Sequence, residues 1–135
     1  MGTVRNILFI MTDQLRADYL SCMGHPSLET PHLDNLAVRG VRFTRAYSQA
    51  PVCGPSRMSF YTGRYMFSHG SHWNGVPLNL GERTMGEYLR PLGLRTVLVG
   101  KTHFVADSEG MRRVGLDPES RDGVLFGEGG FEPLE

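Results

Sequence analysis

A cysteine next to a predicted helix start is the first feature of the sequence that points to chemistry. Cys53 is followed by Gly54 and Pro55, which prepare a tight turn, and the pattern predicts a helix from about Ser56. The amino end of a helix presents free N–H groups and a partial positive charge, which favour a bound anion or a thiolate. A small structural cysteine in a turn is the alternative interpretation.

Polar side chains also follow two apolar runs. Residues 6–11 form a compact apolar block, typical of a buried strand in a parallel sheet, and Asp13 and Gln14 come directly after it. Lys101 and His103 follow a second apolar run in the same way. Ligands of open α/β sheets collect beyond the carboxyl ends of the strands, so these positions are candidates for a site. The alternatives are a helix-capping aspartate, a surface lysine and a loop histidine.

The segments between these positions alternate helix and strand patterns. Residues 30–40 and 84–92 carry the start and stop signals of short helices. Residues 41–47 alternate apolar and polar side chains as a half-buried strand does, and residues 94–99 form a second apolar strand. This order predicts an α/β layer fold with parallel crossovers. Residues 105–135 are glycine-rich and charged, and we predict either loop there or structure that needs a partner.

Length and charge narrow the possible functions. The chain has 135 residues, enough for one modest domain, and its 14 Lys and Arg balance its 14 Asp and Glu. A neutral chain has no basic surface for a nucleic acid or an anionic membrane, so we expect neither partner. Near the start there is no apolar run long enough for a membrane span or a secretory signal, so we expect a cytoplasmic protein. Cys22 matches no catalytic motif and is interpreted as a structural thiol.

The segment around Cys53 resembles a known signature. Cys53-x-Pro55-Ser56-Arg57, followed by Thr62-Gly63-Arg64, is similar to the signature of the formylglycine-dependent sulfatases, which belong to the alkaline phosphatase superfamily. Further segments fall in the family's order and spacing, namely residues 6–14, 30–36, 40–43 and 100–104. The resemblance spans roughly residues 5–105.

The family resemblance implies a fold. It implies an α/β architecture, the amino-terminal part of an alkaline-phosphatase-like sandwich with a mainly parallel central sheet that is incomplete in this chain. We divide the chain into residues 1–104, the amino-terminal part of the catalytic domain, and residues 105–135, a truncated, loop-rich continuation. Family members are several times longer, and their remaining metal ligands, an Asp followed by Asn or His, have no match after Phe104. We therefore expect the remainder of the catalytic domain to be missing and the isolated fragment to be inactive.

The resemblance also implies a nucleophile and a metal. Cys53 would be oxidised by a maturation enzyme to formylglycine, whose hydrated aldehyde carries two hydroxyls on one carbon. One hydroxyl would attack the sulfur or phosphorus, and the other would then drive C–O cleavage and release the product, whereas a serine would leave a stable ester. One divalent metal ion, Ca²⁺ first with Mn²⁺ or Mg²⁺ as alternatives, would be held by Asp13, Gln14 and the derivative of Cys53. Gln14 replaces the second aspartate of many sulfatases and resembles the choline-sulfatase and phosphonate monoester hydrolase branches.

Further side chains receive roles from the same resemblance. Arg57 would orient the formylglycine hydroxyl and help to neutralise the centre. Lys101 and His103 would hold the anionic group or donate to the leaving oxygen, as catalytic and substrate-binding residues. Asn74 resembles a substrate contact of some relatives, and its loop, which begins near His69, would edge a substrate pocket.

Together these expectations define a sulfuric ester hydrolase that cleaves a small-molecule sulfate monoester. Two alternatives stay open. The first is a phosphonate monoester or phosphodiester hydrolase of the same superfamily. The second is a non-catalytic fragment that acts as a binding module and keeps the motifs by descent.

Overall fold

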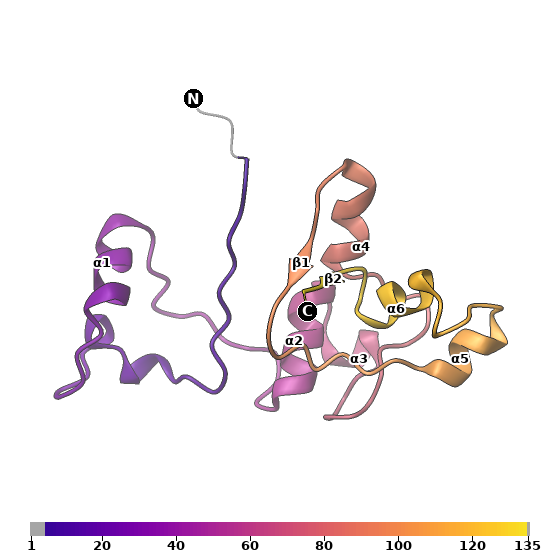
Figure 1. The fold of residues 1–135 in the computed structure, drawn as a ribbon. Helices are drawn as coiled ribbons and strands as arrows, with labels where there is room; N and C mark the ends of the chain where they lie inside the picture. The colour runs from indigo at the N-terminus through magenta and orange to yellow at the C-terminus, as the bar shows by residue number, and fades with distance from the viewer. Residues whose placement is uncertain (1–4, 135) are drawn as a thin grey trace. The chain divides into compact units, whose positions relative to one another are not determined.

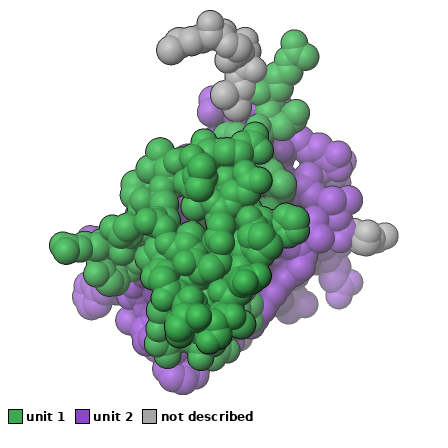
Figure 2. All heavy atoms as spheres, turned by 90° about the vertical axis from the view of Figure 1, so that its left-hand side faces the viewer, with its two compact units in different colours: residues 1–47 green, residues 48–135 purple. Residues whose placement is uncertain are grey.

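The computed structural model describes residues 5–134 of the chain. It divides into two compact units, residues 1–47 and residues 48–135 (Figure 2). Each unit is described by itself. The helices and strands of the described residues are shown in Figure 1 and are, in chain order, the 3-10 turns η1 (Ala17–Tyr19) and η2 (Ser21–Met23), the helices α1 (Pro31–Arg39), α2 (Cys53–Thr62), α3 (Met66–His69) and α4 (Met85–Leu89), the 3-10 turn η3 (Arg90–Leu92), the strand β1 (Val97–Leu98), the helices α5 (Ser108–Arg113) and α6 (Arg121–Gly127), and the strand β2 (Glu132–Pro133).

In the first unit, hydrogen bonds to one carboxylate join α1 to η2. The hydroxyl of Ser21 donates to Asp34 over 2.6 Å, and the backbone N–H of Cys22 donates to the other carboxylate oxygen over 2.9 Å. These bonds hold the pKa of Asp34 below its ordinary value, and the bond from Ser21 has the largest effect. The helix predicted over residues 30–40 is confirmed, with proline in its first turn.

Both strands predicted in the first unit are wrong. Residues 6–11 and 41–47 are neither helix nor strand, and their large apolar side chains are exposed, with Ile7 at 87% and Phe43 at 77%. A strand of a parallel sheet is stabilised by hydrogen-bonded neighbours and by cover on both faces. Within the described residues neither run pairs with another strand, so the apolar pattern has no sheet to join.

The second unit is organised around an aromatic cluster. Met58 and Tyr61 of α2 and Phe131, just before β2, are buried together, and the ring of Phe104 stacks on Tyr61 with 4.9 Å between centroids. The rings of Tyr61 and Phe131 meet edge to face at 5.6 Å. The helix that carries Cys53 is therefore fixed by residues from the far end of the chain.

A short parallel sheet confirms the α/β class. β1 and β2 pair in parallel, with Val97 opposite Glu132 and Leu98 opposite Pro133. The connection between them runs through α5 and α6, as a parallel pairing requires (Figure 1). The strand predicted at residues 94–99 is confirmed in place, although it is only two residues long.

The helix predicted over residues 84–92 is also confirmed, as α4 followed by η3. Thr84 caps α4 in a capping box with Glu87, and Gly93 ends η3 in the left-handed region at φ 78°. Of the two alternatives predicted beyond residue 104, the loop is wrong, because α5, α6 and β2 lie there. The division at residue 104 stays a prediction. Within the described chain, no helix combines the length and the apolar character that a membrane span needs.

Candidate functional site

Cys53 is the first residue of α2. The helix begins three residues earlier than predicted, because the N–H of Ser56 already donates to the carbonyl of Val52 over 3.1 Å. It ends at Gly63, which adopts the left-handed conformation at φ 67°. Cys53 and Cys22 are both half-buried free thiols, so no disulfide ties them. The amino end of a ten-residue helix therefore presents a thiol.

Two polar side chains from distant segments flank that thiol. Asn74 Oδ1 lies 3.5 Å from Cys53 Sγ and accepts a hydrogen bond from the N–H of Gly54 over 2.8 Å. His103 Nε2 lies 4.0 Å from the same sulfur. The structure thus brings together three of the residues that the sequence marked as site candidates.

Arg57 lies four residues after Cys53, about one turn further along α2. Its side chain is buried, with 6% of the residue exposed, and Nη1 donates to the backbone carbonyl of Lys101 over 2.7 Å. The residue Lys101 itself is exposed. The bond therefore anchors the loop that carries Lys101 and His103 to the helix that carries Cys53.

The backbone is unusual at two candidate positions. Among the described residues, Gln14 at φ 54° and His103 at φ 59° are the non-glycine residues with positive φ. A side chain in this region costs on the order of 1–3 kcal/mol, and such strain is concentrated at functional sites. Gln14 and His103 are both among the site candidates that the sequence predicts.

His69 is a structural residue, and its predicted place at the edge of a pocket is wrong. Its side chain is fully buried at the end of α3, where Nε2 lies 2.9 Å from the hydroxyl of Ser59. Nδ1 accepts the N–H of Ser71, so the ring is neutral and its proton sits on Nε2, which donates to Ser59. Burial lowers the pKa of His69, an effect that nearby Glu82 opposes. Nothing in the local sequence distinguishes this histidine from a loop histidine.

Asp13 and Gln14 lie in the first unit, as exposed residues outside any helix or strand. Their carboxylate and amide oxygens are donors that Ca²⁺ and Mg²⁺ accept, but two side chains are fewer than such ions need. In the described part of the chain, no three His, Cys, Asp or Glu side chains are grouped so as to hold a metal. The donors therefore fit a hard cation in kind but do not complete a site.

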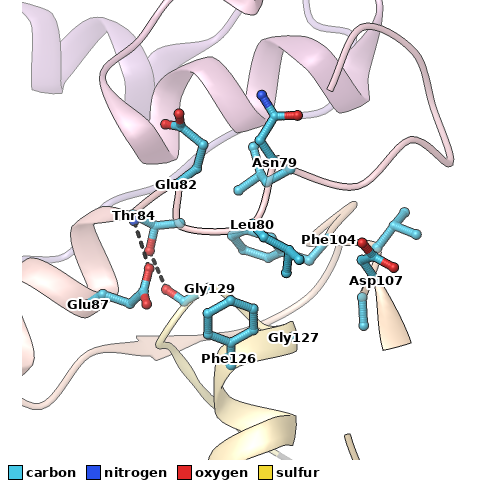
Figure 3. A pocket seen from close by; sticks show the side chains of 13 residues that line it. Asn79, Leu80, Glu82, Thr84, Glu87, Phe104, Asp107, Phe126, Gly127 and Gly129 are labelled. Atoms are coloured by element: carbon cyan, nitrogen blue, oxygen red, sulfur yellow. Dashed lines mark hydrogen bonds between the residues drawn. The ribbon is translucent and has the colours of Figure 1, made fainter. Parts of the chain in front are cut away.

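A small cavity in the second unit lies apart from the cysteine (Figure 3). It measures about 30 Å³ and is lined by residues such as Leu80, Phe104 and Phe126, beside the hydrogen bonds that Thr84 makes with Glu87 and Gly129. This volume holds about one water molecule, whereas ligand pockets measure roughly 300 Å³ or more. The cavity is therefore too small for a substrate site.

The second unit combines a parallel α/β fold with a cysteine in the first turn of helix α2. The Sulfatase family model matches residues 5–117. The chain therefore belongs to the sulfatase family, which confirms the resemblance drawn from the residues.

Individual relatives agree with the family assignment. The chain is 40% identical over 119 residues to an ulvan-active sulfatase of Formosa agariphila, covering 88% of this chain and 22% of that protein. It is 42% identical over 116 residues to the steryl-sulfatase of Rattus norvegicus, covering 76% and 20%. The crystal structure of a phosphonate monoester hydrolase of Agrobacterium radiobacter matches with a TM-score of 0.69 and 34% identity, covering 90% of this chain and 23% of that one. The chain thus spans about a fifth of the length of these relatives.

Proposed function

We propose that the chain supplies the nucleophile-bearing part of a hydrolase that cleaves a small-molecule sulfate monoester. One observation carries the proposal: Cys53 begins α2 with Asn74 Oδ1 and His103 Nε2 both within 4.0 Å of its sulfur. Membership of the sulfatase family supports it.

The proposed nucleophile derives from Cys53. Oxidation of the thiol to an aldehyde by a maturation enzyme would give formylglycine, and its hydrate offers two hydroxyls where a serine offers one. The second hydroxyl matters because it allows the covalent ester to break down without a separate water attack. Residue 53 stands at the amino end of α2, where the partial positive charge of the helix favours an anionic ester.

The surrounding side chains have complementary tasks in this proposal. Lys101 supplies a compact positive charge for the non-bridging oxygens of the ester. His103 Nε2, at 4.0 Å from Sγ, donates to the leaving oxygen as the alcohol departs. Arg57 holds the loop of both residues through the carbonyl of Lys101.

Asp13 and Gln14 are the proposed metal donors of this chain. A bound divalent cation, with Ca²⁺ first and Mn²⁺ or Mg²⁺ as alternatives, would offset the negative charge of the ester. Because these two side chains are too few for a complete site, we propose that ligands outside the 135 residues finish it. The isolated chain is then expected to be inactive.

The test is hydrolysis by the whole protein that carries this chain, made together with a maturation enzyme. Cys53→Ala should abolish hydrolysis of an aryl sulfate, whereas Cys22→Ala should leave it unchanged because Cys22 belongs to no catalytic motif. Wild-type turnover by Cys53→Ala would refute the proposal.

Phosphonate monoester hydrolysis is the second candidate. It is favoured by the likeness to the phosphonate monoester hydrolase of Agrobacterium radiobacter, and by Gln14, which brings less negative charge than an aspartate. The ratio of kcat/KM for an aryl sulfate to that for the matching aryl phosphonate decides between them.

A further inference from the structure

One side chain touches the cysteine-bearing turn of α2 at two points. Asn74 Oδ1 accepts the N–H of Gly54 over 2.8 Å, and the thiol of Cys53 donates to the same oxygen over 3.5 Å. The first bond joins residues 20 apart in the chain. The oxygen of Asn74 is therefore engaged within the protein, by residue 53 and by its successor.

The amide of Asn74 has a defined orientation as a result. An N–H donor must face an acceptor, so the atom against Gly54 is the oxygen, and the NH₂ end points elsewhere. Asn74 is an exposed residue in the loop after α3. The contact thus fastens an otherwise exposed loop to the amino end of α2.

Gly54 leaves the space that this contact requires. A Cβ at residue 54 would lie 2.6 Å from Asn74 Oδ1 and 3.3 Å from Asn74 Cα. Contacts under 3.0 Å are not tolerated by real Cβ atoms, so any larger residue would push the side chain of Asn74 away. The φ angle of Gly54 is not positive, so space rather than backbone conformation demands glycine here.

We propose that Asn74 is a positioning residue for residue 53, and that glycine is needed at position 54 because a larger residue would displace the side chain of Asn74. Asn74 holds the side chain of residue 53 and the next backbone N–H with one oxygen. The inference rests on the proposed function only in taking residue 53 as the precursor of the nucleophile. The geometry itself is measurable on the unconverted thiol.

Two substitutions of Asn74 separate positioning from mere packing. Asn74→Ala removes the acceptor of the S–H group and uncovers the sulfur. Asn74→Asp keeps an oxygen acceptor for the N–H of Gly54 and a side chain of the same size over the sulfur. A side chain that only packed within its own loop would leave the reactivity of Cys53 unchanged in Asn74→Ala.

The first measurement is the rate at which iodoacetamide alkylates Cys53, in protein made without a maturation enzyme. We expect Asn74→Ala to react about threefold faster than wild type or more, and Asn74→Asp to react no faster than wild type. The rate at Cys22, followed in the same samples, should stay constant. Trp73→Ala, the neighbouring residue with 60% of its surface exposed, is the matched control and should react as wild type does.

The second measurement is amide hydrogen exchange at Gly54. Its N–H should exchange faster in Asn74→Ala and stay protected in Asn74→Asp. The N–H of Gly63, which donates to the carbonyl of Ser59 at the other end of α2, reports whether the helix is intact. Slow exchange at Gly63 in every variant shows that lost protection at Gly54 is local.

Gly54→Ala tests the space argument. It should reproduce the alkylation rate and the Gly54-site exchange of Asn74→Ala, and the double variant should add nothing further, because both changes break the same contact. Equal alkylation rates in Asn74→Ala and wild type, or an unchanged Gly54 amide in Asn74→Ala, would overturn the inference. Failure of the proposed function is distinguishable, since it would appear as no ester hydrolysis by converted protein while these measurements on the thiol still hold.

Discussion

Arg57 Nη1 donates a hydrogen bond to the backbone carbonyl of Lys101 over 2.7 Å. The bond joins residues 44 positions apart and is made by a guanidinium that is almost fully buried. A permanently charged, planar donor in such a place is hard to replace. The loop that carries Lys101 and His103 therefore owes its position beside Cys53 in part to α2 itself.

Removing Arg57 should cost stability as well as activity. Arg57→Ala deletes a charged donor and its packing, and we expect the free energy of unfolding to fall by about 2–3 kcal/mol in urea titration. Arg95→Ala is the control, because its ion pair with Glu132 at 2.8 Å has 70% of the arginine side chain exposed. That exposed pair should contribute less than about 1 kcal/mol. Equal effects of the two substitutions would contradict the anchoring role.

Lys101 is expected to act on the reaction and hardly on the fold. Lys101→Ala should lower kcat/KM of the complete, converted enzyme by about a hundredfold or more, the scale of losing one preorganised electrostatic donor. Its melting temperature should stay near that of wild type, because the residue is exposed. Activity within a few-fold of wild type would return Lys101 to the status of a surface lysine.

His103 allows a sharper test, because its backbone is strained. If His103 donates to the leaving oxygen, His103→Ala should impair esters of poor leaving groups more than activated aryl esters. His103→Gly should lose the same activity yet be about 1 kcal/mol more stable than His103→Ala, since glycine adopts φ 59° without strain. If His103→Ala and His103→Gly were both as active and as stable as wild type, neither the role at the leaving oxygen nor the backbone strain would hold.

The helices could be predicted from residues within them or next to them, whereas a strand depends on a partner that is distant in the sequence. Thr84 caps the start of α4 and Gly93 ends η3, so the nearby sequence was enough to predict this helical segment. The apolar run at residues 6–11 carries a strand pattern, but no strand partner lies within the described chain. Asp107 and Ser120 cap α5 and α6. Both are ordinary helix-capping residues, but the high glycine content of residues 105–135 favoured a loop prediction there.

The candidate site divides in the same way. Residue types and spacing selected Cys53 and His103, which the fold brings to 4.0 Å from each other. No local pattern predicted that the side-chain oxygen of Asn74 would accept a hydrogen bond from the N–H of Gly54. That contact depends on the position of the Asn74 loop in the folded unit. Burial of His69 is likewise a property of the packed unit, not of its neighbours in sequence.

The buried neutral state of His69 makes stability depend on pH. Burial holds its pKa below the ordinary value of 6.5, so below that pH the unfolded chain binds a proton that the folded chain resists. The free energy of unfolding is therefore highest above about pH 6.5 and should fall as the pH is lowered to about 5.

Matched glutamine variants isolate this effect. His69→Gln removes the titrating ring and should flatten the pH dependence, whereas His72→Gln, at an exposed position, should leave it unchanged. The measurement is urea unfolding of each variant across this pH range. The same slope in His69→Gln and wild type would show that another group is responsible.

The most direct test of the account is the chemical state of Cys53. In cells that contain the maturation enzyme, mass spectrometry should find the peptide carrying Cys53 lighter by the difference between a CH₂SH and a CHO side chain. The peptide carrying Cys22 should keep its thiol in the same sample. An unmodified thiol at Cys53, in cells where a known sulfatase is converted, would contradict the claim that this residue is the precursor of the nucleophile.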